Sequence, residues 1–272
     1  MEENETVIYY DKIIKLHNSF HLGDNIFNIC YFNKISSYLK ENNIIVFYYL
    51  KEKYIQEVLE FLITQYVILI GIENETEIGI HFWIGNKDLL YNIHHQSENN
   101  YLSFNDMYVK FFNVFSDMIG IPKYIDTIIY SDEDLLHRYN MLDEKYKNID
   151  VLIINSIPLS GQLLYNEFNW KFLVHIFNKN YNVVTTKKVD NIKCTLDDGL
   201  SIKTIGALSI HAKIIISVNT GVTTGILNSY TLNNVKGVFI FDRGCHYNFE
   251  KFYNYKTLDE IDIEKVFKLL NS

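Results

Sequence analysis

The chain has 272 residues, of which 48% are hydrophobic, and it carries a formal net charge of -8. This length suits one large α/β domain or two domains of ordinary size, and the hydrophobic share is enough to build buried cores. Acidic residues are spread along the chain, whereas a nucleic-acid-binding protein needs a clustered basic face, so the composition argues against that class. A sugar nucleotide can still bind at a local site.

The sequence shows no sign of membrane insertion or secretion. It has no run of about 18 apolar residues, and its first ten residues, MEENETVIYY, lack the basic start and apolar stretch of a signal peptide. We therefore expect no transmembrane segment and a cytoplasmic location. Cys30, Cys194 and Cys245 are widely spaced with no CxxC motif, which predicts neither a disulfide framework nor a thiolate zinc site.

Apolar runs of strand length alternate with amphipathic stretches of helix length, a pattern typical of parallel α/β units. The N-terminal half predicts strands near residues 12–17, 43–50, 66–72 and 78–85, and helices near residues 25–41, 53–64 and 104–118. The following stretch, 120–150, contains Pro122 and a charged segment. We interpret it as the crossing between two domains.

The same alternation begins again after this crossing. We expect strands within residues 150–156, 181–186, 213–218 and 235–241, and helices within residues 166–180, 200–212, 219–230 and 262–272. The pattern predicts an α/β protein with two Rossmann-like domains, residues 1–147 and 148–272, that face each other across a cleft. Ligands of such sheets bind at the carboxyl ends of the strands.

The stretch HLGDNIFNICYF, residues 21–32, places a carboxylate where a strand gives way to a helix. Gly23 permits a turn that brings the backbone close to a ligand, and Asp24 then lies in the first turn of the helix. One interpretation makes Asp24 the N-cap of that helix, because Asp is a preferred capping residue. The other makes it a general base at a strand-helix junction that faces a cleft.

The stretch KIIISVNTGVTTGILN, residues 213–228, leads from a buried strand into Asn219, Thr220 and Gly221, before a helix expected from about Val222. Free N–H groups at a helix N-terminus, a small Gly and Thr hydroxyls together suit a diphosphate. The alternative interpretation is an ordinary capped helix after a tight turn.

In order and spacing, these stretches resemble the GT-B glycosyltransferases of the heptosyltransferase kind, often called family 9. That family has an N-terminal Gly-Asp followed by an apolar helix, like HLGDNIFNICYFNKI here. Its second domain opens with a strand, a small-residue loop and a helix that carries Trp, like residues 151–186 here. A later helix and a strand that ends in Asp-Thr-Gly correspond to LSIKTIGALSIHAKIIISVNTGVTTG.

The resemblance implies a metal-independent transferase, without a cofactor, that moves a sugar from a nucleotide-sugar donor to a hydroxyl of a glycan or other acceptor. The first domain would bind the acceptor and the second the nucleotide sugar. Asp24 would be the base, with His21 and Gly23 at the acceptor side or in the turn. The implied donor site consists of Ser160, Gly161, Asn219, Thr220, Gly221 and Thr223, with Lys187 and Arg243 as possible phosphate contacts.

Two positions depart from the family pattern. Asn219 stands where the family has Asp, and the basic residue of the loop before the Trp helix is missing around Gln162. The alternative hypothesis is therefore a catalytically inactive GT-B module that binds a glycan or a nucleotide. A sugar-nucleotide epimerase or a dehydrogenase is disfavoured, because no GxGxxG motif opens either half.

Other polar residues have simpler interpretations. Asp132 and Asp134 have the DxD spacing that holds Mn²⁺ or Mg²⁺ in metal-dependent transferases, but they precede a helix-like segment, which favours an acidic first turn of a helix. His94 and His95 are adjacent, point in different directions and make a poor metal pair. His246, like Arg243, follows a predicted strand and is a candidate to face the cleft.

Overall fold

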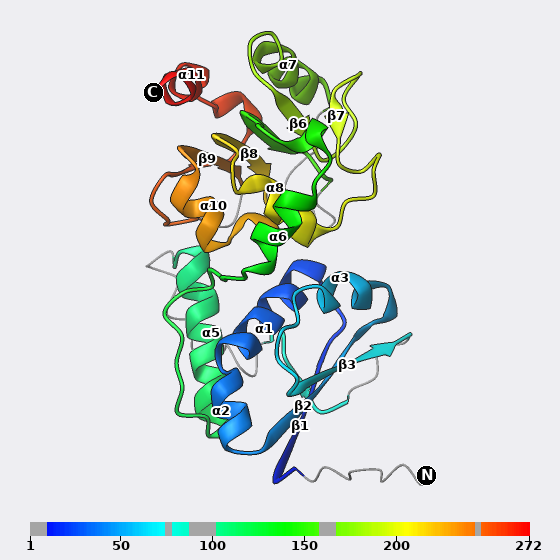
Figure 1. The fold of residues 1–272 in the computed structure, drawn as a ribbon. Coiled ribbons are helices and arrows are strands. Elements are labelled where there is room, and N and C mark those ends of the chain that lie inside the picture. The colour runs from blue at the N-terminus through cyan, green and yellow to red at the C-terminus, as the bar shows by residue number, and fades with distance from the viewer. Residues whose placement is uncertain (1–9, 74–77, 87–101, 158–166, 243–245) are drawn as a thin grey trace, which may run out of the picture. The chain divides into compact units, whose positions relative to one another are not determined.

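The computed structural model of the chain describes residues 10–73, 78–86, 102–157, 167–242 and 246–272 (Figure 1). The chain divides into two compact units. The first comprises Met1–Tyr91 and Phe111–Ile125, and the second comprises Asn92–Lys110 and Asp126–Ser272. Residues 126–147 therefore group with the second unit, whereas the sequence pattern predicted that they belong to the first domain.

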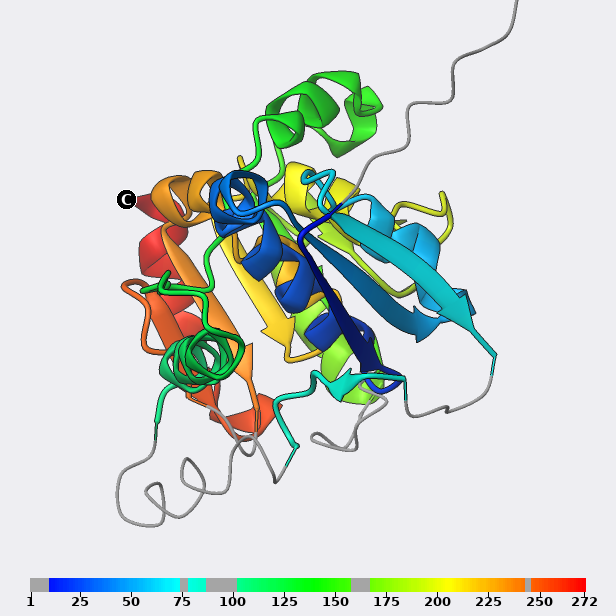
Figure 2. The same ribbon diagram turned by 90° about the horizontal axis from the view of Figure 1, so that it is seen from below.

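The described residues of the first unit form a parallel sheet of four strands in the order β3-β2-β1-β4. Figure 2 shows β1, β2 and β3 side by side. The strands are β1 (Lys12–Asn18), β2 (Ile44–Lys51), β3 (Val67–Ile72) and β4 (Ile80–His81). The helical elements are α1 (Leu22–Lys34), α2 (Ser36–Glu41), η1 (Glu52–Tyr54), α3 (Ile55–Leu59) and the later part of α5 (Phe104–Ile119).

Aromatic rings fill the core of the first unit. Tyr31 of α1 stacks on Phe112 of α5 with ring centroids 4.6 Å apart, and Phe82 lies 4.2 Å from Phe115. The Tyr31 hydroxyl and the Ser116 hydroxyl are hydrogen-bonded at 2.7 Å. Burial raises the pKa of Tyr31 above its usual range, so this phenol stays neutral inside the core.

The described residues of the second unit form a parallel sheet of six strands in the order β10-β9-β8-β5-β6-β7. The strands are β5 (Val151–Ile154), β6 (Val183–Thr185), β7 (Lys193–Cys194), β8 (Ile214–Val218), β9 (Gly237–Phe241) and β10 (Phe252–Tyr255). The helical elements are α6 (Asp134–Met141), η2 (Glu144–Tyr146), α7 (Glu167–Phe177), α8 (Ile202–Ser209), α9 (Thr223–Ile226), α10 (Ser229–Asn234), η3 (Leu258–Glu260) and α11 (Ile263–Asn271).

Helices α7 and α11 pack against one face of this sheet. Trp170 and Phe177 of α7 and Val266 of α11 join one buried cluster with alternate residues of β5, β8 and β9. The intervening residues of these strands, such as Leu152 and Ile215, are buried as well. A parallel sheet that is buried on both faces needs strands that are almost continuously apolar, which explains why these strands are visible in the sequence.

Most expected elements are present, and the prediction of two Rossmann-like α/β units is confirmed. The single helix expected within residues 219–230 is wrong, because the segment forms two short helices, α9 and α10. The side chain of Asn228 accepts a hydrogen bond from the backbone N–H of Thr231 and thereby starts α10 as a new helix. The helix expected at 25–41 is likewise divided at Ile35, and β7 and β10 were not predicted.

In the part of the chain that the structure describes, no helix has the length and apolar character needed to cross a membrane.

Candidate active site

The first sheet has a topological switch point beside β1, and this point marks a candidate ligand site. The chain continues from β1 to β2 on one side, whereas β4 pairs with β1 on the other side. In open α/β sheets, ligands bind at the carboxyl ends of the strands at such a switch point. The segment from Ser19 to Asp24 follows the carboxyl end of β1, and Trp83 follows the carboxyl end of β4.

Asp24 is the third residue of α1, and it is held by a side chain that the sequence did not reveal. Trp83 donates a hydrogen bond from its indole Nε1 to Oδ2 of Asp24 at 3.0 Å. The interpretation of Asp24 as an N-cap is wrong, because His21 occupies that position. Gly23 also lies within the helix and has no positive φ angle, so the turn expected at this glycine is not formed there.

Trp83 belongs to a group of stacked rings at this edge of the sheet. Phe20 stacks on Trp83 with ring centroids 4.3 Å apart, and His81 stacks on His17 at 4.7 Å. Phe20, His81 and Trp83 are half-buried, and His21 is exposed. The edge of the sheet therefore presents half-buried ring surface next to one carboxylate, a combination found in small-molecule sites.

A buried polar network fixes the start of α1 to the sheet beneath Asp24. The Tyr48 hydroxyl of β2 donates to Oδ1 of Asn25 at 2.8 Å and accepts from Nδ2 of Asn28 at 2.8 Å. Asn28 also donates to the carbonyl of Phe82, the residue before Trp83, at 2.9 Å. Burial raises the pKa of Tyr48 above its usual range, which keeps the phenol protonated as a donor to Asn25. The network therefore holds both partners of the Asp24–Trp83 pair.

The second sheet has its own switch point between β5 and β8. The chain passes from β5 to β6 and β7 on one side, whereas β8 and β9 lie on the other. Asn155 follows β5 and is buried, and its side chain bonds the backbone of Lys187, accepting from N–H at 2.7 Å and donating to C=O at 3.1 Å. Lys187 is thereby fixed through its main chain near this edge, after the end of β6.

The loop after β8 carries the predicted donor residues Asn219, Thr220, Gly221 and Thr223. Thr223 Oγ1 accepts from the backbone N–H of Thr220 at 3.0 Å and donates to the carbonyl of Val218 at 2.8 Å. Helix α9 has only four residues, so the argument from a helix N-terminus is wrong here. The hydroxyl oxygen of Thr220 is buried and has no hydrogen-bond partner among the described residues.

Asn219 belongs to a buried polar cluster that the sequence did not predict. Its Nδ2 donates to Oδ2 of Asp242, and its Oδ1 accepts from the Tyr247 hydroxyl at 2.9 Å. Asp242 follows β9, and its exposed fraction is 5% against 9% for Asn219. These two residues directly follow adjacent parallel strands, so a polar residue after each predicted strand was the signal available in the sequence.

The DxD pair forms ion pairs instead of an open carboxylate site. Lys203 of α8 is 4% exposed, and its Nζ lies 2.6 Å from Asp132 and 3.1 Å from Asp134. Arg138 lies one helical turn further along α6 and binds Asp134 at 2.6 Å, and this bond is the main reason that the pKa of Asp134 falls below its usual value. The expected acidic first turn of a helix is confirmed for Asp134, whereas Asp132 lies two residues before the helix.

Several candidates lie outside the described residues: Ser160, Gly161, Gln162, Arg243, His94, His95 and Cys245. Of the other residues singled out, Cys30 and Cys194 are buried. Lys188 is exposed and lies 3.3 Å from Asp197. His246 is exposed, and its carbonyl accepts a hydrogen bond from the backbone N–H of Phe104.

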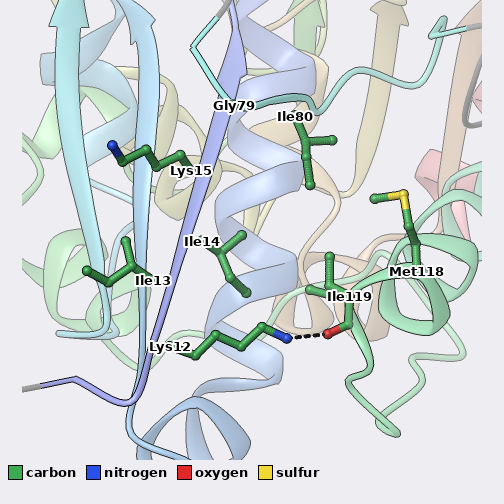
Figure 3. A pocket seen from close by; sticks show the side chains of 8 residues that line it. All are labelled: Lys12, Ile13, Ile14, Lys15, Gly79, Ile80, Met118 and Ile119. Atoms are coloured by element: carbon green, nitrogen blue, oxygen red, sulfur yellow. Dashed lines mark hydrogen bonds between the residues drawn. The ribbon is translucent and has the colours of Figure 1, made fainter.

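A groove of about 600 Å³ lies elsewhere in the first unit, beside β1 and the end of α5 (Figure 3). Its lining residues are Lys12, Ile13, Ile14, Lys15, Gly79, Ile80, Met118 and Ile119. Lys12 spans the groove and donates to the carbonyl of Ile119 at 2.6 Å. The groove begins at the amino end of β1, whereas Asp24 follows its carboxyl end, so the two are distinct features.

Comparisons with family models and with curated proteins find no match. Among solved structures, the chain is similar to the glycosyl transferase family 9 protein from Veillonella parvula DSM 2008, with 11% identity, a TM-score of 0.50, and coverage of 95% of this chain and 90% of that chain. It is also similar to the E. coli heptosyltransferase WaaC with ADP-2-deoxy-2-fluoro heptose, with 10% identity, a TM-score of 0.57, and coverage of 96% and 99%.

The structure of WaaC with ADP gives nearly the same values, with 9% identity, a TM-score of 0.56, and coverage of 96% and 97%. At such low identity the similarity concerns the fold. The chain has the two-domain Rossmann-like α/β fold of the family 9 glycosyltransferases and heptosyltransferases, as the motifs of its sequence predict.

Proposed function

We propose that the protein is a glycosyltransferase that moves a sugar from a nucleotide-sugar donor to an acceptor hydroxyl. The observation that carries the proposal is the Asp24 carboxylate, which lies at the switch point of the first sheet and is oriented by the Trp83 indole. The position of Asp24 matches the Gly-Asp motif of the resembling family, and the fold matches family 9 structures. A cytoplasmic location stays a prediction of the sequence.

In the proposed reaction, Asp24 takes the proton of the acceptor hydroxyl while the hydroxyl oxygen attacks the anomeric carbon of the donor sugar. The bond between that carbon and the diphosphate oxygen breaks, and the nucleoside diphosphate leaves with the electron pair. Oriented hydrogen-bond donors stabilise the developing charge, and we assign this role to the loop after β8. The proposal requires neither a metal nor a cofactor.

The donor side of the proposal rests on the second sheet. The loop with Thr220 and Gly221 follows the carboxyl end of β8 at the switch point, where ligands of doubly wound sheets bind. The solved WaaC structures carry ADP or an ADP-heptose analogue, which makes adenine nucleotides the first donors to test. The side chain of Asn219 is already hydrogen-bonded to Asp242 and Tyr247. This observation supports the inactive binding module as the second hypothesis.

The decisive experiment compares wild type with Asp24→Asn after a thermal-shift screen of nucleotide sugars has identified a donor. Asn keeps the size of Asp and can still accept the indole hydrogen bond, but it cannot take the proton. Turnover should therefore fall at least about 10²-fold. Since Asp24 is not the cap, the variant loses mainly the favourable interaction with the helix dipole, and stability should change by less than about 1 kcal/mol.

Two outcomes would contradict the proposal. A folded Asp24→Asn protein with wild-type transfer rates would remove Asp24 as the base. Binding of nucleotide sugars by the wild type without transfer or hydrolysis, over a broad panel of acceptors, would assign the inactive binding module instead.

A further inference from the structure

The pairing of β8 with β9 brings Asn219 and Asp242 together. Val218 and Phe241 are register partners at the ends of these parallel strands, and the backbone N–H of Asn219 donates to the carbonyl of Phe241 at 3.0 Å. Asn219 directly follows Val218, and Asp242 directly follows Phe241. The Nδ2 group of Asn219 donates a hydrogen bond to Oδ2 of Asp242.

The orientation of the Asn219 amide is set from its other end. The Tyr247 hydroxyl donates to Oδ1, so the Nδ2 group is directed at Asp242. Tyr247 is 1% exposed, stacks on Phe104 with centroids 4.5 Å apart, and exchanges two hydrogen bonds with Asn254. Asn219 is therefore a fixed structural donor toward the carboxylate of Asp242.

This cluster explains why position 219 is Asn, where the resembling family has the Asp of its Asp-Thr-Gly motif. An Asp at 219 would place two carboxylates in contact at a site where both residues are more than 90% buried. Like charges so close and so poorly solvated destabilise the folded state. Asn at position 219 removes one of the two negative charges, and its amide group donates a hydrogen bond to the remaining carboxylate. That carboxylate belongs to Asp242, which follows the neighbouring strand β9.

We propose that Asp242 supplies the carboxylate of the donor site in place of residue 219, and that it binds hydroxyl groups of the nucleotide sugar. The inference rests on the proposed function and names a binding residue for that same site. A carboxylate only accepts hydrogen bonds and repels a diphosphate, so its partner on the donor is a hydroxyl pair, either of the ribose or of the transferred sugar.

A second observation at the same edge of the sheet also points to a ligand. The adjacent residue, Thr220, has a buried hydroxyl with no hydrogen-bond partner among the described residues. Buried polar groups are nearly always paired, and a ligand that binds after β8 would supply the partner. Asn219 acts in this arrangement as a positioning residue, because it reaches the ligand only through Asp242.

The test uses isothermal titration of the full chain with ADP, GDP, UDP and CDP and with a nucleotide sugar of each base. The variants are Asp242→Asn, Asn219→Asp and the exchange Asn219→Asp/Asp242→Asn. Asp242→Asn should fold and lose at least about tenfold in affinity, as expected when charge-assisted hydrogen bonds are removed. A loss already present with the free nucleoside diphosphate assigns the ribose, and a loss confined to the nucleotide sugar assigns the transferred sugar.

Measurements of thermal stability test the repulsion between carboxylates separately from ligand binding by Asp242. Asn219→Asp should melt at a lower temperature at pH 7 and recover as the pH falls, because protonation of one carboxylate relieves the repulsion. The exchange variant restores a single carboxylate and should recover the melting temperature at pH 7. Asp150→Asn is the matched control, since it removes one negative charge beside Lys213 at the amino end of β5 and should leave nucleotide affinity unchanged.

Three results would overturn the inference. Unchanged affinity of Asp242→Asn for every ligand that the wild type binds would remove Asp242 from the site and leave the proposed function intact. If Asn219→Asp were as stable as the wild type at pH 7, repulsion between two carboxylates would not explain the Asn at position 219. A wild type that binds none of these nucleotides would overturn both the inference and the donor side of the proposed function.

Discussion

The indole N–H of Trp83 donates to the carboxylate of Asp24 at 3.0 Å, across 59 positions of the sequence. The contact exists because β4 pairs with β1, which brings the residues that follow each strand to the same edge of the sheet. A hydrogen bond to a carboxylate favours its charged form and fixes its direction. Trp83 is therefore a positioning residue for the proposed base.

Trp83→Phe tests this positioning role. Phe keeps the stacking surface against Phe20 but removes the N–H donor. We expect kcat to fall about tenfold, as for the loss of one hydrogen bond to a charged group. We also expect the acid limb of the pH profile of kcat/KM to move to higher pH, since the charged carboxylate has lost a donor.

A purely structural role for Trp83 predicts a different result. The melting temperature would fall, and the pH profile of the remaining activity would stay in place. A Trp83→Phe protein with an unshifted profile and unchanged kcat would contradict the positioning role.

Thr220→Val tests the buried hydroxyl in the loop after β8. Val has nearly the same shape, and the hydroxyl that it replaces has no partner among the described residues, so the free protein should be as stable as the wild type or slightly more stable. Affinity for the donor nucleotide should fall about fivefold, the equivalent of about 1 kcal/mol for one hydrogen bond. Calorimetry and titration measure the two effects.

Thr223→Val is the matched control for this loop. Its hydroxyl makes hydrogen bonds at 2.8 and 3.0 Å to the backbone of Val218 and Thr220. Its removal should therefore destabilise the free protein by about 1–3 kcal/mol. If Thr220→Val proved the more destabilising of the two and left nucleotide affinity unchanged, the Thr220 hydroxyl would have a structural role and no ligand.

Chelation tests the prediction that donor binding needs no metal. The carboxylates of Asp132 and Asp134 are paired with Lys203 and Arg138, and the ammonium group of Lys203 lies between the two carboxylates, where a divalent cation would have to bind. Binding and turnover should be unchanged after treatment with EDTA. Loss of either one with EDTA, followed by its return with Mn²⁺, would assign the DxD pair to a metal after all.

Lys203→Met tests the structural role of the same ion pairs. Lys203 and Asp132 are both at least nine-tenths buried, and removal of one partner leaves an uncompensated charge. We expect a loss of about 3 kcal/mol in the free energy of unfolding. Lys213→Met is the control, because Lys213 is 49% exposed in its pair with Asp150 and should cost less than about 1 kcal/mol. Equal losses in the two variants, measured by urea denaturation, would contradict this account.

The sequence predicted those elements whose signal is local. The apolar run at residues 213–218 became β8, because a strand buried on both faces needs continuous apolar residues. The amphipathic stretches at 104–118 and 262–272 became α5 and α11 for the corresponding reason. Two strands were not predicted. β7 has only two residues, and β10 lies at the edge of the sheet with just one of its four residues buried, so neither gives a clear apolar run.

By itself the sequence determined the fold class, most of the strands along the chain and the Gly-Asp and Asn-Thr-Gly positions. Only the tertiary structure decided what those positions contact. Trp83 meets Asp24 through the pairing of β1 with β4, and Asp242 meets Asn219 through the register of β8 with β9. Hydrophobic periodicity is a property of neighbouring residues, whereas strand pairing joins distant ones, so the partners of each polar side chain appear only once the sheets have formed.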